Sequence, residues 1–254
     1  MIKFNWKIFA VFALVFFSSL SLAANQITTS PSASLTGNLF SSLDQDWRAP
    51  VKYMVIVTSL SFIPAAVIAS TSFARIIIVL SMLRMALGLQ STPPNVVIVL
   101  LSLFLTFFSM SPVFNHVYSQ AITPYLNETQ SLEQSVTVGA DELKRFMIAH
   151  TDEDTFNMLI DATKGTPPDN LSDVSYMTLL PAFMLSEIKV AFQIGFILFI
   201  PFILIDLIVA SILMGLGMIM LPPMTISMPI KILVFVLADG WALLSSALIS
   251  SVYQ

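Results

Sequence analysis

The sequence predicts an all-α membrane protein made of two long bent helical hairpins with an acidic helical insertion between them. Composition is the first reason, since 56% of the 254 residues are hydrophobic and only 10% are charged, whereas soluble domains carry roughly a quarter charged residues. The second reason is that the apolar residues form long blocks around one acidic segment. The third is a double proline in each apolar half, Pro93-Pro94 and Pro222-Pro223, which suits the turn of a hairpin because proline disfavours the helix interior.

Residues 1–24 have the form of a secretory signal peptide. Two lysines precede an apolar run over residues 8–17, and small residues around Ala23 follow. The run is shorter than the roughly 20 residues that a full span needs, so we expect cleavage near Ala23, with an uncleaved anchor helix as the alternative. Residues 25–50 are polar and rich in Ser and Thr, and we expect them to form an extracytoplasmic lead-in.

Residues 51–117 are predicted to form the first helical hairpin. Apolar blocks run from Tyr53 to Ser70 and from Asn95 to Val117, and the stretch between them carries Arg75 and Arg84 but no acid. On one helix, a separation of nine residues at about 100° each places the two arginines on opposite faces. They cannot share one solvated stripe, so we expect at least one of them to turn inward to a partner.

Residues 118–178 are predicted to form the acidic insertion on the extracytoplasmic side. Between Pro124 and Thr178 the chain holds ten acidic residues against three basic ones, so this segment should face water. Two short helices are predicted, over residues 139–150 and 151–164, the second with Thr151 as its N-cap and acids in its first turn. The acids are most simply a solvated surface, because they lack the spacing of a calcium-binding loop.

Residues 179–254 are predicted to form the second hairpin, with a methionine-rich loop at its turn. The chain stays apolar for more than forty residues after Leu179, which is too long for one straight span. The residues expected to interrupt this block are Pro181, Pro201, Gly215 and Gly217. Lys231 follows the double proline, and residues 232–254 are predicted to form the last apolar helix.

The basic residues set the expected orientation, because Lys and Arg that flank membrane spans stay on the cytoplasmic side. The turn with Arg75 and Arg84 and the turn before Lys231 both lack acids. Both turns are therefore predicted to face the cytoplasm, and the acidic insertion and the ends of the mature chain are predicted to face outward.

Charged residues also occur within or beside the apolar sequence of the second hairpin. They are Glu187, Lys189, Asp206, Lys231 and Asp239. Each charge costs roughly 2.5–3.5 kcal/mol at mid-bilayer on insertion scales, so each needs a partner or water. Glu187 and Lys189 are two residues apart and point different ways on a helix, which favours a pair across the hairpin such as Glu187 with Lys231. We expect these five residues, together with Arg75 and Arg84, to form charge pairs that fix the packing of the helices. A direct role in transport is the alternative.

Little in the sequence supports an enzyme. The chain has no cysteine and only two histidines, His116 and His150, so we expect no metal, no cofactor and no thiol chemistry. The sequence has no basic cluster interleaved with aromatic residues, so nothing in it indicates nucleic-acid binding. Asp206 and Asp239 are two carboxylates of the kind that an aspartyl protease pairs, but the Gly-x-Gly-Asp sequence of intramembrane aspartyl proteases is absent before Asp239.

Two long blocks of the chain closely resemble the FliP family of flagellar type III secretion. The first, "FARIIIVLSMLRMALGLQSTPPNVVIVLLSLFLTFFSMSPV", covers Phe73 to Val113, and the second covers Leu179 to Leu244 and contains "LMGLGMIMLPPM". The resemblance implies an all-helical subunit that assembles as a pentamer with FliQ and FliR and next to FlhB. In the family this assembly is the channel through which unfolded flagellar proteins leave the cytoplasm, in the basal body at the bacterial inner membrane. The resemblance also implies hairpins raised out of the bilayer plane toward the periplasm.

The methionine-rich loop of that family lines the narrowest part of the pore and acts as a gasket. It corresponds here to Met218, Ile219 and Met220, where many relatives have three consecutive methionines. Methionine is unbranched and polarizable, so a ring of it can repack around varied contents, and narrow apolar constrictions close by dewetting. Residues expected to let the backbone leave the helix are Gly215, Gly217, Pro222 and Pro223.

The sequence therefore predicts a core subunit of the flagellar protein-export gate with no catalysis of its own. Identical copies, the partner subunits, unfolded export substrates and membrane lipid are its expected contacts. The alternatives are a virulence-type export-gate subunit, a conventional ion or solute channel, and an intramembrane aspartyl protease.

Overall fold

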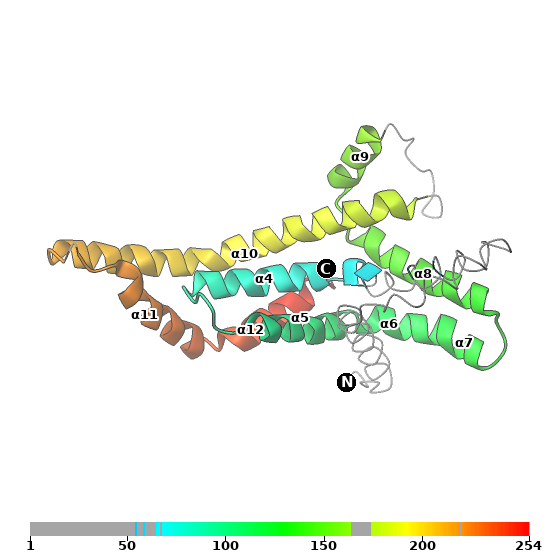
Figure 1. Cartoon of the computed structure of the whole chain (residues 1–254), viewed down its shortest axis with the longest axis horizontal. Coiled ribbons are helices and arrows are strands. Elements are labelled where there is room, and N and C mark those ends of the chain that lie inside the picture. The colour runs from blue at the N-terminus through cyan, green and yellow to red at the C-terminus, as the bar shows by residue number, and fades with distance from the viewer. Residues whose placement is uncertain are drawn as a thin grey trace, which may run out of the picture. The chain divides into compact units, whose positions relative to one another are not determined.

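The computed structural model describes residues 54, 58, 65–66, 68–163, 174–218 and 220–253. The predicted signal peptide and the polar lead-in, residues 1–50, lie outside the described residues. The chain divides into two compact units, Met1–Ile68 and Ala69–Gln254, and the helices from Phe73 onward belong to the second unit. All the regular elements of this unit are helices over the described residues, which confirms the predicted all-α fold class (Figure 1).

The first two helices of this unit form a hairpin. Helix α4 (Phe73–Ala86) packs on α5 (Asn95–Ser109) and, more extensively, along α10 (Tyr176–Gly215), and Figure 1 shows α4 running between them. Gly88, in the turn after α4, has φ +79, a left-handed conformation that glycine adopts without steric cost. Pro94 is the N-cap of α5, so the first double proline does lie at a hairpin turn.

The apolar block predicted from Asn95 to Val117 is two helices rather than one. Helix α5 ends at Ser109 and α6 (Ser111–Val117) begins with a proline in its first turn. Proline cannot donate to the preceding turn, and the chain bends by 62° at this break. A π-helical turn, η1 (Tyr118–Ile122), and the short helix α7 (Thr123–Leu126) follow.

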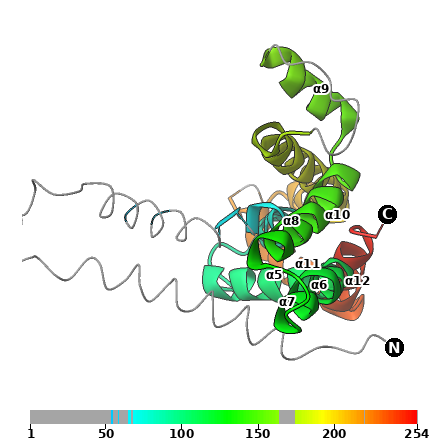
Figure 2. The ribbon, with the colours of Figure 1, turned by 90° about the vertical axis from the view of Figure 1, so that its right-hand side faces the viewer.

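The two helices predicted in the acidic insertion are present after η1 and α7, but with different limits. Helix α8 (Leu132–Ala149) begins earlier than expected because Ser131 and Gln134 form a reciprocal capping box. Helix α9 (Glu153–Ala162) has Asp152 as its N-cap, not Thr151. The Thr151 hydroxyl instead donates to the Met147 carbonyl at the end of α8, so it provides a hydrogen-bond partner for a carbonyl of the preceding helix. Both views show α9 standing apart from α5 and α6 (Figures 1 and 2).

Helix α10 runs without interruption for 40 residues and contains Pro181 and Pro201. The expectation that these two prolines break the apolar block is wrong. In apolar surroundings each unpaired backbone group is costly, so a continuous helix that loses single hydrogen bonds at proline is favoured over an open break. At 1.5 Å per residue, α10 is about 60 Å long.

The return from α10 is also divided. Helix α11 (Pro223–Leu237) and helix α12 (Gly240–Ser250) are bent by 66° relative to each other, where one last helix was expected. Asp239 between them has φ 49, which ends α11. Lys231 consequently lies inside α11 rather than in the turn before it.

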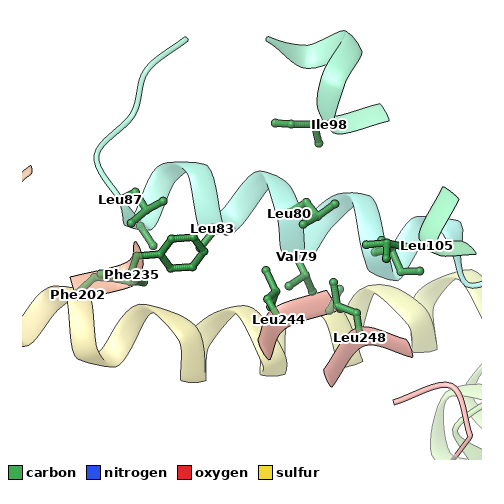
Figure 3. Close-up of a cluster of buried hydrophobic side chains, with 13 residues drawn as sticks. Val79, Leu80, Leu83, Leu87, Ile98, Leu105, Phe202, Phe235, Leu244 and Leu248 are labelled. Carbon is green, nitrogen blue, oxygen red and sulfur yellow. The ribbon is translucent and has the colours of Figure 1, made fainter. Parts of the chain in front are cut away.

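Among the described residues, α10 is long and apolar enough to cross a membrane, and there are up to three such spans if each bent pair of helices serves as one. The main hydrophobic core joins α4, α5, α10, α11 and α12. Figure 3 shows Val79 and Leu80 of α4 between side chains of α5 and α12. A second cluster, which includes Met110, Met147 and Phe183, joins the α5–α6 junction to α8 and α10. The two clusters hold α10 against the rest of the unit.

Candidate functional site

The methionine-rich loop begins where a glycine stops α10. Gly217 has φ +73, and its N–H donates to the Met214 carbonyl at 3.0 Å, while the Met218 N–H donates to the Leu213 carbonyl at 2.9 Å. This pair of bonds is a Schellman motif, which requires a left-handed residue after the helix. Gly217 therefore ends α10 in a defined turn. Gly215 is the last helical residue, with no atom within 4 Å of where a side chain would begin.

The described side chains of the loop pack little on the rest of their own chain. Met220 is 99% exposed and Met218 is 43% exposed, and the neighbouring large side chains Met214, Leu216 and Met224 are exposed as well. Figure 1 shows the end of α10 extending past α4. Ile219 lies outside the described residues. Burying such apolar side chains stabilises a protein by roughly 1.5–3 kcal/mol each, so this loop is suited to contact something beyond its own chain.

The second double proline begins α11. Pro222 is the N-cap and Pro223 is the first helical residue, a position where the missing N–H costs nothing. The Thr225 hydroxyl donates to the Pro222 carbonyl at 2.8 Å. These prolines fix the start of α11, and the flexibility expected of the loop stays a prediction.

Arg75 and Glu187 form a buried ion pair between α4 and α10. Arg75 is 3% exposed and Glu187 is 0% exposed, and the guanidinium donates to both carboxylate oxygens, from Nε at 2.9 Å and from Nη2. Arg75 Nη1 also donates to the Ser251 carbonyl at 2.6 Å. One cation thus ties α4, α10 and the end of α12 together.

Lys231 and Asp206 form the second pair, between α11 and α10. Lys231 Nζ lies 2.6 Å from Asp206 Oδ2 and donates to the Ala86 carbonyl at 3.1 Å. Ser227, one turn before Lys231, donates to Asp206 Oδ1 at 2.6 Å. The Glu187–Lys231 pair expected across the hairpin is therefore wrong, because each of these residues has a nearer partner.

The three remaining charges lie toward the surface. Lys189 is exposed and pairs with Asp152 at 3.0 Å, so Glu187 and Lys189 have different partners. Arg84 donates to the Asn95 side chain at 2.6 Å and to the Pro93 carbonyl. Asp239 is exposed at the α11–α12 junction and has no ion-pair partner among the described residues. The hydrogen bond from Lys189, followed by that from the Thr155 hydroxyl, holds the pKa of Asp152 below its usual range.

Ser227, Ser251 and Asp152 are among the partners of these charged residues that were not predicted from the sequence. Ser227 had a local signal, since it lies four residues before Lys231 and shares its helix face. Asp152 had a weaker one, because it precedes two acids at a helix start and aspartate is a preferred N-cap. Ser251 acts through its carbonyl, which no side-chain pattern marks.

Comparison of the sequence with known proteins assigns the chain to a family. The model of the FliP family matches residues 56–248. The chain is 49% identical over 210 residues to the flagellar biosynthetic protein FliP of Pectobacterium carotovorum, covering 83% of this chain and 81% of that protein. It is 45% identical over 215 residues to FliP of Bacillus subtilis, covering 84% and 97%, and 44% identical over 207 residues to FliP of Aquifex aeolicus, covering 80% and 86%. The chain therefore belongs to the FliP family.

Proposed function

We propose that this protein is a core subunit of the flagellar type III protein-export gate. Its relatives in several bacteria carry the name flagellar biosynthetic protein FliP. With identical copies and partner subunits it forms the channel that passes unfolded flagellar proteins across the inner membrane. The names of these relatives favour the flagellar apparatus over the related virulence-type gate.

The observation that carries this proposal is the projecting methionine-rich loop at the end of α10. Met220 is almost fully exposed and Met218 is half-exposed, at the end of a helix about 60 Å long. When identical copies surround one axis, such loops meet and form a narrow apolar collar. Thioether side chains repack readily, so the collar seals against ions when empty and adapts to a passing polypeptide.

The location and the partners belong to the same proposal. The protein resides in the inner membrane within the flagellar basal body, as a pentamer with FliQ and FliR and beside FlhB. The acidic helices α8 and α9 face outward and the turn containing Arg84 faces the cytoplasm, in accordance with the positive-inside rule. The length of α10 supports hairpins raised toward the periplasm, since the hydrocarbon core of a bilayer is only about 30 Å thick.

No catalytic role is part of this proposal. Both carboxylate oxygens of Asp206 are bound by Lys231 and Ser227, an arrangement that suits a structural ion pair better than a shared-proton protease dyad. Energy for export comes from elsewhere in the apparatus.

The test is the double substitution of Met218 and Met220 by alanine in the assembled gate. Both side chains pack little on their own chain, so assembly with the partner proteins, measured by the mass of the gently solubilised complex, is expected to be unchanged. Leakage of a small solute is expected to rise, because the collar loses flexible apolar volume in every copy. The matched control replaces the exposed Met158 and Met177, which lie far from the loop in sequence, and should leave leakage unchanged. Unaltered permeability in the Met218 and Met220 variant with intact secretion would defeat the proposal.

A further inference from the structure

A cavity of about 210 Å³ lies between α4, α5 and α12. Its wall is almost entirely apolar. The buried Leu80 of α4 and Leu87, the C-cap of α4, line it, together with the more exposed Val97 of α5 and Trp241 of α12. Apolar cavities hold water poorly and accept apolar ligands. The cavity thus has the size and chemistry to receive part of a hydrocarbon chain.

Arg84 lies at the rim of this cavity and is the charged residue that lines it. Its guanidinium donates through Nη1 to the Asn95 side chain and the Pro93 carbonyl, both of which are uncharged. No carboxylate of the described residues forms an ion pair with it. In the sequence, no Asp or Glu occurs from Trp47 to Asn127.

This situation differs from that of the other three basic residues in the described apolar helices. Arg75 pairs with Glu187, Lys231 pairs with Asp206, and Lys189 pairs with Asp152. A cation without a counter-charge, next to apolar surface in a membrane protein, favours an anionic ligand. Basic pockets between membrane helices bind the headgroups of anionic lipids. The two remaining nitrogens of Arg84, Nε and Nη2, are suited to a phosphate, which guanidinium groups bind through paired N–H groups.

We propose that this cavity binds an anionic phospholipid, with part of one acyl chain between α4, α5 and Trp241 and the phosphate on Arg84. The site would fix a lipid at the α4–α5 turn, far along α10 from the acidic helices. The proposal needs only a membrane location, so it stands or falls separately from the sealing role of the methionine-rich loop.

The fluorescence of Trp241 can report which lipid occupies the cavity, because Trp241 lines the cavity and is one of only three tryptophans in the chain. With Trp6 and Trp47 replaced by phenylalanine, the full chain is reconstituted into vesicles of phosphatidylcholine and phosphatidylglycerol. The bromine label is carried by one lipid or the other, at equal mole fractions. Brominated acyl chains quench tryptophan on contact, so the ratio of quenching reports which lipid occupies the cavity. We expect phosphatidylglycerol to be preferred about fivefold, the contribution of one basic residue to anionic-lipid binding.

Two variants identify the site. Arg84→Gln should bring the preference to about one, and Leu101→Phe, which adds volume at the cavity wall, should lower it while the charge is retained. Arg145→Gln removes an equal charge from an exposed residue of α8 and should leave the preference unchanged. Equal quenching by the two lipids, or a preference that survives Arg84→Gln in protein of unchanged helicity, would overturn the proposal. Either result would mean that the cavity receives only bulk lipid or a protein side chain.

Discussion

Replacing Glu187 with glutamine is expected to lower the free energy of unfolding by roughly 3–5 kcal/mol, the usual cost of breaking a buried ion pair from one side. The structure supports the upper part of this range. Arg75 donates to both carboxylate oxygens, and hydrogen bonds to charged groups contribute roughly 1.5–3 kcal/mol each. The substitution leaves the buried guanidinium without a counter-charge, and its bonds to the carbonyl and hydroxyl of Ser251 do not supply one.

Thermal unfolding of the detergent-solubilised protein, followed by loss of the monodisperse species, is a suitable assay. For a chain of this size each kcal/mol shifts the midpoint by roughly 2–4 °C, so a fall of about 10 °C is expected. Replacing both Arg75 and Glu187 with leucine should cost less than either single change, because no unpaired charge remains. Glu142→Gln breaks the exposed pair with Arg145 and should cost less than about 1 kcal/mol. If Glu187→Gln behaved like this exposed control, the pair would not be holding α4 to α10.

Three further predictions concern other parts of the fold. Gly217→Ala should destabilise the end of α10 by roughly 1–2 kcal/mol, since the position requires the left-handed conformation. Gly215→Ala should be neutral or stabilising. Equal effects of the two substitutions on thermal unfolding would contradict the Schellman turn. At Gly195 a Cβ would overlap the Met82 thioether, so Gly195→Ala should cost roughly 1–3 kcal/mol, and a double-mutant cycle with Met82→Ala should show coupling; additive effects would rule out this contact. The lysine hydrogen bond that lowers the pKa of Asp152 should stabilise the junction of α9 and α10 fully above the ordinary aspartate value of about 3.9. That stabilisation is lost as the pH falls through the lowered pKa. The protection of α9 amides against hydrogen exchange, corrected for the intrinsic exchange rate at each pH, should therefore fall at acidic pH, and Asp152→Asn, which keeps an N-cap, should remove this pH dependence.

The sequence was sufficient for features that depend on local rules. The apolar blocks and the acidic segment predicted the helical class, and the rotation of about 900° between Arg75 and Arg84 indicated correctly that the two do not share one environment. Both double prolines lie at hairpin turns because proline is tolerated where a helix begins. These outcomes follow from the periodicity of a helix and the properties of one residue type.

Partners distant in the sequence could not be predicted in the same way. Glu187 lies 112 residues from Arg75, and its alternative partner Lys231 was favoured only because it belongs to the same hairpin. The contact depends on how α4 lies along α10. The helical pattern of either segment alone does not give this arrangement. Continuity through Pro181 and Pro201 was likewise missed, since it depends on the apolar surroundings of the whole helix rather than on the local preference of proline.

The great length of α10 converts small rotations into large displacements. Gly215 lies 28 residues beyond Glu187, a distance of about 42 Å along a helix. Rocking the rod by about 5° around its buried arginine contact would carry the tip sideways by roughly 4 Å. In the proposed ring of identical copies, that motion would widen or narrow a central aperture by about the breadth of a side chain, without unwinding any helix.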